Sequence, residues 1–117
     1  MVLEDCGGRL PLLACEFIPL IMPLFIILGK LSDRAIEKMK EAKERDARAE
    51  EAIRSAGGRL IAHYYTIGRY DVVDIVELPS AEVLAKVVIE IGKHGTVSTE
   101  TMTALLPEHM YEMAKGP

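Results

Sequence analysis

The strongest chemical signal in this sequence is a histidine and an aspartate within one predicted β-hairpin, at residues 59–79. The expected register of the hairpin places His63 directly opposite Asp74, within hydrogen-bonding reach. The carboxylate could fix the tautomer of the imidazole and let His63 act as a general base. The simpler interpretation is a structural polar pair that lines an interface or a wet cavity, since the pair has neither a nucleophile nor a metal to act on.

The hairpin follows from two apolar segments on either side of Gly68 and Arg69. Both segments are rich in aromatic or β-branched residues, which favour strands. A two-residue loop that begins with glycine suits a type II′ turn, because its first central position needs a positive φ. The resulting cross-strand pairs are Ile67–Tyr70, Tyr65–Val72, His63–Asp74 and Ile61–Val76.

Both faces of this hairpin are substantially apolar. Alternation places these eight residues on one face. The other face carries Leu60, Ala62, Tyr64, Thr66, Asp71, Val73, Ile75 and Glu77. A sheet covered by helices on one side only usually has a polar outer face. We therefore expect helices on one face and a second copy of the same sheet on the other, in a homodimer formed through the sheet face.

The rest of the chain predicts strands and helices around the hairpin. A continuous apolar run indicates a strand buried on both faces, and serines and glycines mark the helix ends. The expected elements are a strand at 24–30, a helix from Ser32 or Asp33 to about Ala56, the hairpin, a helix from Ser80 to about Gly92, a strand at 96–105 and a short helix at 108–115. This order is that of the ferredoxin-like split βαβ fold, in the α+β class. It predicts a four-stranded antiparallel sheet in the order 4-1-3-2, with both main helices on one face.

The first 21 residues do not fit this pattern. From Leu10 to Leu28 the chain is apolar except for Glu16, but three prolines and this carboxylate make it a poor membrane span. Acidic residues near the start argue against a signal peptide. We expect residues 1–21 to be an N-terminal extension outside the core fold, and residues 22–117 to form the domain.

Charge and cysteine content argue against several kinds of partner. The chain has 14 Lys and Arg against 18 Asp and Glu, a net charge of −4, which gives no attraction to nucleic-acid phosphates or to an anionic membrane. Cys6 and Cys15 precede the domain and lack a metal-binding spacing. We therefore expect a cytoplasmic protein with no nucleic-acid partner, no membrane association, no metal and no cofactor.

Several short motifs together resemble the GYD-domain family of small prokaryotic proteins. They are Met22-Pro23 with LFIILGKLSD, Gly57-Gly58, Gly68-Arg69-Tyr70-Asp71 with VVDIVELP, and Gly95 to Thr101. The resemblance covers about residues 22–113 and implies no settled activity. The family is similar to dimeric α/β-barrel proteins, in which two sheets pack face to face and small molecules often bind between sheet and helices. Its namesake residues, Gly68, Tyr70 and Asp71, imply either a turn that is held in place or the rim of a ligand site.

Three functional hypotheses remain open. The one we favour is a non-catalytic homodimer that binds a small molecule or has a structural role, with Tyr65, Tyr70 and Asp71 as candidate ligand-binding residues. The alternative is a cofactor-free oxygenase or isomerase of the dimeric-barrel type that uses His63 and Asp74. RNA binding ranks last, because it needs exposed aromatic residues with basic neighbours and this protein is acidic.

Overall fold

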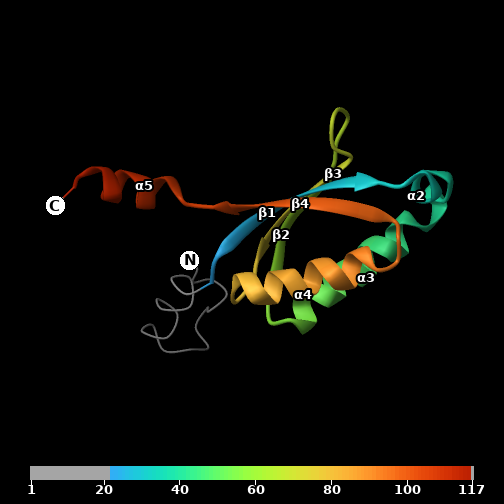
Figure 1. Cartoon of the computed structure of the whole chain (residues 1–117), viewed down its shortest axis with the longest axis horizontal. Helices are drawn as coiled ribbons and strands as arrows, with labels where there is room; N and C mark the ends of the chain where they lie inside the picture. The colour runs from blue at the N-terminus through green and yellow to red at the C-terminus, as the bar shows by residue number, and fades with distance from the viewer. Residues whose placement is uncertain (1–21, 117) are drawn as a thin grey trace.

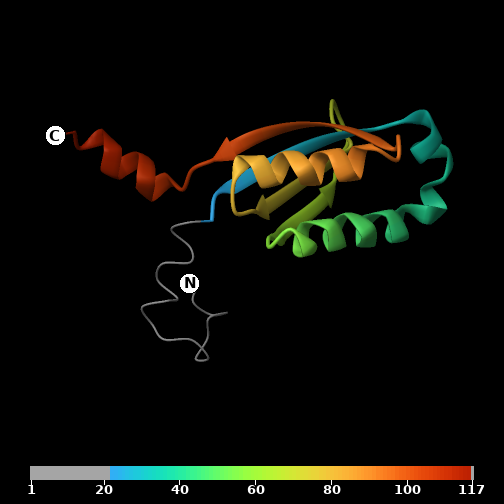
Figure 2. The same ribbon diagram turned by 60° about the horizontal axis from the view of Figure 1, so that its bottom comes forward.

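The computed structural model describes residues 22–116, which form a four-stranded antiparallel sheet with two main helices on one face (Figures 1 and 2). The strands are β1 (Leu24–Leu31), β2 (Arg59–Tyr65), β3 (Val72–Glu77) and β4 (Val97–Ala104), and the main helices are α3 (Ala42–Ser55) and α4 (Ala81–Gly92). The sheet order β2-β3-β1-β4 is the expected 4-1-3-2 read from the opposite edge. The ferredoxin-like α+β fold is therefore confirmed. The expected extension at residues 1–21 lies outside the described residues.

The hydrophobic core lies between the two central strands and the helices. Its most deeply buried large side chains are Ile53 on α3, Val76 on β3 and Leu78 just after β3. Phe25 of β1 packs in the same cluster, which agrees with the continuous apolar pattern of that strand. The hydroxyl of Ser80 accepts the N–H of Val83 at 3.2 Å and caps α4 where the sequence indicated a helix start.

Two glycines end α3 and direct the chain into β2. Gly57 has φ 87°, and its N–H donates to the carbonyl of Arg54, while the N–H of Gly58 donates to the carbonyl of Ile53. The helix ends at Gly57-Gly58 as expected, and this pair of bonds is a Schellman motif. A Cβ atom on Gly58 would lie 2.3 Å from the main-chain oxygen of Glu77. Only glycine fits this position without a shift of the backbone.

The helix expected from Ser32 or Asp33 to about Ala56 is not continuous. It is divided into α2 (Asp33–Glu37), a 3₁₀ turn η1 (Met39–Glu41) and α3. Lys38 leaves the helical conformation, with φ −110° and ψ 40°. The guanidinium of Arg45 donates to the carbonyls of Ala35 and Lys38 at 3.3 and 3.1 Å. The carbonyl of Lys38 also accepts the N–H of Glu41 at 2.9 Å, so Arg45 joins the break to α3 in addition to the bond within the 3₁₀ turn.

The register of the hairpin was predicted correctly at its centre and wrongly at its start. His63 pairs with Asp74 and Tyr65 pairs with Val72, but a β-bulge lies between Leu60 and Ala62. As a result Leu60, rather than Ile61, is opposite Val76. The extra residue changes the side of the sheet on which Leu60 lies, so Leu60 packs against the core while Ile61 is exposed.

The loop of the hairpin is also longer than a two-residue turn. The ladder stops at Tyr65 and Val72, and Ile67 does not pair with Tyr70. The N–H of Asp71 donates to the carbonyl of Gly29 at 2.8 Å, and its carboxylate accepts the N–H of Leu31 at 2.8 Å. The N–H of Thr66 still donates to the carbonyl of Asp71 at 2.8 Å across the hairpin, so Asp71 joins the base of the loop both to its own hairpin and to β1.

Helix α5 (Pro107–Ala114) follows β4 and projects away from the sheet (Figures 1 and 2). It has no buried residue. Leu106, Met110 and Met113 are exposed and follow the i, i+4, i+7 spacing of one helical stripe. The helix therefore presents an apolar side that its own domain does not cover.

Candidate functional site

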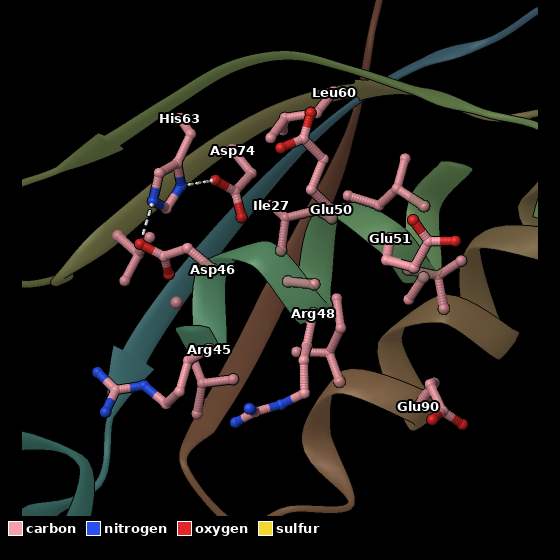
Figure 3. Close-up of a pocket in the computed structure, with 18 of the residues that line it drawn as sticks. Ile27, Arg45, Asp46, Arg48, Glu50, Glu51, Leu60, His63, Asp74 and Glu90 are labelled. Atoms are coloured by element: carbon pink, nitrogen blue, oxygen red, sulfur yellow. Dashed lines mark hydrogen bonds and ion pairs between the residues drawn. The ribbon is translucent and has the colours of Figure 1, made fainter. Parts of the chain in front are cut away.

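A cleft of about 990 Å³ lies between helices α3 and α4 and the face of the sheet that these helices cover. Its apolar wall includes Ile27 and Leu60 from the sheet, and Val88 and Ile91 from α4. Its polar groups come mainly from α3 and from the hairpin. Figure 3 shows part of this lining, with Ile27, Leu60, His63 and Asp74 on the strand side.

His63, Asp74 and Asp46 form a hydrogen-bonded cluster at one end of this cleft (Figure 3). The Nδ1 atom of His63 contacts Oδ1 of Asp74, and Nε2 lies 3.0 Å from Oδ2 of Asp46. The hydroxyl of Tyr65 donates to the same Asp46 carboxylate, 2.9 Å from Oδ2. The Tyr65 ring meets the His63 ring edge to face, with 5.3 Å between centroids. Two strands and helix α3 thus contribute to one cluster.

The two carboxylates favour the protonated form of His63. Burial lowers the pKa of His63, but the hydrogen bonds and charges of Asp74 and then Asp46 outweigh it, so this pKa is raised above its ordinary value of 6.5. Burial raises the pKa of Asp74, although the bond from His63 opposes this, and the nearby Asp46 charge raises it further. Burial and the bond to Asp46 likewise raise the pKa of Tyr65. The environment of the cluster thus raises the pKa of His63, Asp74 and Tyr65.

This geometry limits the chemistry that His63 can perform. In the imidazolium form both ring N–H groups donate, one to each carboxylate, so the ring has no lone pair with which to accept a proton. The arrangement therefore fits a group that joins α3 to the sheet better than it fits a general base. Within residues 22–116, no group of three or more His, Cys, Asp or Glu side chains is arranged to hold a metal ion.

The structure separates the other candidate residues from this cluster. Tyr65 lies in it, but Tyr70 and Asp71 do not line the cleft. The hydroxyl of Tyr70 donates to Glu100 on β4, and Asp71 binds the main chain of β1 as described above. These contacts hold the hairpin loop in place, which is one of the two roles that the family resemblance implied for this motif.

Asp46 is the member of the cluster that the sequence analysis missed. It lies on α3, three residues before Ala49 and seven before Ile53. These spacings place it on the face of the helix that meets the sheet. A carboxylate on the stripe that faces the core could have indicated a polar partner on the sheet. The mixed charges along the whole helix obscured this signal.

Comparisons with known proteins agree with the fold and identify the family. The sequence model of the GYD domain matches residues 25–114. A protein from Thermus thermophilus, named "Glutamine synthetase and cystathionine beta-lyase binding protein", is 33% identical over 85 residues, covering 72% of this chain and 90% of that protein. The crystal structure of MtbAldR superposes with a TM-score of 0.56 at 16% identity.

The superposition covers 72% of this chain but only 52% of MtbAldR, so it shows likeness of fold alone. Among the described residues, no helix is both long and apolar enough to cross a membrane. The family match covers most of the chain, in agreement with the resemblance seen in the sequence motifs. This chain belongs to the GYD domain family.

Proposed function

We propose that this protein is a non-catalytic, cytoplasmic homodimer that binds a small molecule in the cleft between its sheet and its two main helices. The observation that carries this proposal is the cleft itself. Its volume of about 990 Å³ is within the range of small-molecule sites, and its wall is largely apolar with a few polar groups at defined positions. These are the properties that let a pocket bind and orient a ligand.

The homodimer is supported by the apolar face of the sheet that no helix of residues 22–116 covers. This outer face carries Leu24, Ile26 and Leu28 on β1, Tyr64 on β2, Val73 and Ile75 on β3, and Met102 on β4. Tyr64 and Met102 are 61% and 45% exposed. A second sheet packed face to face would remove this surface from water. We therefore propose the outer face as the dimer interface.

Helix α5 gives independent support for a partner. It has eight residues and no buried side chain. Isolated helices shorter than about 12 residues are marginal in water, so a short helix normally depends on tertiary packing. The stripe of Leu106, Met110 and Met113 would supply such packing if it lay on the second protomer.

Binding of another protein is a second candidate function. It is favoured by the name of the Thermus relative, which describes that protein as a binding protein for two enzymes. Purified glutamine synthetase and cystathionine β-lyase should each be tested by surface plasmon resonance against the immobilised protein. Saturable binding to either enzyme would support this candidate, and flat responses to both would remove it.

The test of the main proposal is native mass spectrometry of the protein as purified, without added ligand. We expect a dimer that carries a discrete additional mass, lost on denaturation. A monomer at micromolar concentration would contradict the face-to-face dimer. For the enzymatic alternative, His63→Gln should be assayed with any ligand that the mass identifies. Ligand turnover that disappears in this variant would favour catalysis over simple binding.

A further inference from the structure

We propose that the ligand of the cleft is an amphipathic anion, with an apolar body and a single carboxylate or phosphate group, and that Arg48 at the mouth of the cleft binds its charge. This inference rests on the proposed binding function and adds the chemical class of the ligand. It follows from the distribution of paired and unpaired charges along the wall of the cleft.

The carboxylates of the cleft are already engaged by cations. The pairs are Asp46 and Asp74 with His63, Glu50 and Glu51 with Arg54, and Glu90 with Lys93. A cationic ligand would have to displace one of these partners before it could bind a carboxylate. The acidic groups therefore do not favour a positively charged ligand.

Two arginines of α3 that line the cleft are different. Arg48 forms no ion pair with any carboxylate of residues 22–116. Arg45 donates to the main-chain carbonyls of Ala35 and Lys38, so no carboxylate compensates its charge. The two arginines are three residues apart on α3 and project from neighbouring positions (Figure 3). Guanidinium groups bind carboxylates and phosphates through two parallel hydrogen bonds.

A second hollow, of about 200 Å³, adjoins the cleft at this point and strengthens its positive charge. It shares Arg45, Arg48, His94 and Thr96 with the cleft, and its other walls are Arg34, Ala35, Lys38 and Glu41. Four Lys and Arg side chains thus surround the mouth against one Glu, in a chain whose net charge is −4. This local excess of positive charge favours an anion.

The other walls of the cleft determine the orientation of the ligand, with its anionic group near Arg48. The wall between α4 and the sheet is apolar, with Val88, Ile91 and Leu60. At the far end, the single imidazole of His63 lies between the carboxylates of Asp46 and Asp74, so acidic groups outnumber basic groups there. An anionic group is repelled there and attracted at Arg48. The apolar body must then lie along α4.

The chemical class of the ligand can be tested by titrating the ¹⁵N-labelled protein with octanoate, octyl phosphate, octanol and octylammonium. Acetate serves as an anion without an apolar chain. We expect octanoate or octyl phosphate to shift the amides of residues 45–53 and 88–97. Either anion should bind at least about tenfold more tightly than octanol, as a charge-assisted hydrogen bond predicts. The ratio of octanoate to octyl phosphate affinity then separates a carboxylate from a phosphate ligand.

Two matched variants test the role of Arg48. Arg48→Gln should weaken octanoate binding about tenfold and leave octanol binding unchanged. Arg69→Gln changes the same residue type on the hairpin loop. Arg69 neither lines the cleft nor forms an ion pair within residues 22–116, so this variant should change affinity by less than about twofold. Dispersed amide spectra of both variants establish that each is folded.

Three outcomes would overturn all or part of this inference, and they are distinguishable. Equal binding of octanol and octanoate in the cleft would exclude an anionic class but leave the proposed binding function intact. If no probe shifts the cleft amides, both the class and the cleft as a binding site lose their support. An Arg48→Gln variant with undiminished octanoate affinity would remove Arg48 as the anion-binding residue.

Discussion

The Nε2 atom of His63 lies 3.0 Å from Oδ2 of Asp46, and this hydrogen bond joins strand β2 to helix α3 across the end of the cleft. The other ring nitrogen contacts Asp74 on β3. One imidazolium therefore connects two strands and a helix. Because α3 is rich in charged residues and has only one buried side chain, Ile53, this polar connection supplements a small hydrophobic contact.

The stability of the protein should fall as the pH rises above neutrality. The pKa of His63 is above 6.5 in the folded protein, and it returns to about 6.5 when the chain unfolds. Protonation therefore stabilises the fold. This contribution is complete below pH 6.5 and is lost as the pH rises through the folded-state pKa. Urea unfolding at about pH 6 and about pH 9 would measure the decrease.

His63→Gln is the control for this pH dependence, because glutamine keeps hydrogen-bonding capacity and does not titrate in this range. The variant should show a smaller difference in unfolding free energy between the two pH values. An NMR titration of the wild-type ring protons should give a His63 pKa above 6.5. A value below 6.5, or an unchanged pH dependence in the variant, would contradict the proposed imidazolium.

Asp46→Asn should loosen the attachment of α3 to the sheet. The substitution replaces a charged acceptor of His63 and Tyr65 with a neutral one. We expect a loss of about 1–2 kcal/mol in unfolding free energy, at the low end for a charged hydrogen bond because Asp46 is partly exposed. The pKa of His63 should also decrease, because one of its two carboxylate partners is removed.

Glu44→Gln is the matched control for Asp46→Asn. It neutralises an exposed carboxylate two residues earlier on α3 that forms no ion pair within the described residues. It should change the unfolding free energy by less than about 0.5 kcal/mol. Equal effects of the two substitutions would show that the position of Asp46 opposite His63 has no energetic consequence.

The sequence predicted the His63–Asp74 pair but not its third member, for a physical reason. Cross-strand pairs follow from counting outwards from a turn, because strand geometry repeats every two residues. The predicted two-residue turn was wrong, but the predicted pairing was still correct. The loop from 66 to 71 has two residues on each side of Gly68 and Arg69, so the same strand residues lie opposite each other. The contact with Asp46 depends on how a helix packs on the sheet, which no local rule specifies.

The features of the fold that were missed have a similar origin. Both depend on contacts that the local sequence does not specify. The bulge at Ile61 lets Leu60 pack against the core, and Arg45, seven residues after the helix break at Lys38, donates to the carbonyl of Lys38. By contrast, the strand order, the Ser80 cap and the end of α3 follow from strong local signals, and these were predicted correctly.

Gly58→Ala should destabilise the fold strongly. The new Cβ atom would lie 2.3 Å from the carbonyl oxygen of Glu77, so the α3–β2 turn or strand β3 must move. We expect a loss of about 2–4 kcal/mol in unfolding free energy. Gly92→Ala is the control, because its Cβ would have no neighbour closer than 3.9 Å. That variant should stay within about 1 kcal/mol of wild type.

Ile26→Lys should convert the proposed dimer into a folded monomer. Ile26 lies on the outer face of β1 and is only partly buried within the protomer, so a lysine there can reach water when the protomer is alone. Between two packed sheets the ammonium group would lose its hydration without a partner carboxylate. Light scattering coupled to size-exclusion chromatography would measure the mass.

Ile89→Lys supplies the comparison for this last experiment. It makes the same change on α4, where the side chain of Ile89 is 69% exposed and lies away from the outer sheet face. This variant should remain dimeric with unchanged thermal stability. If both variants remain dimeric at the wild-type concentration, the interface cannot lie on the outer face of the sheet. If only Ile26→Lys becomes monomeric and it keeps its helical circular dichroism, the substitution has disrupted dimerisation without unfolding the protomer. A face-to-face dimer predicts this result.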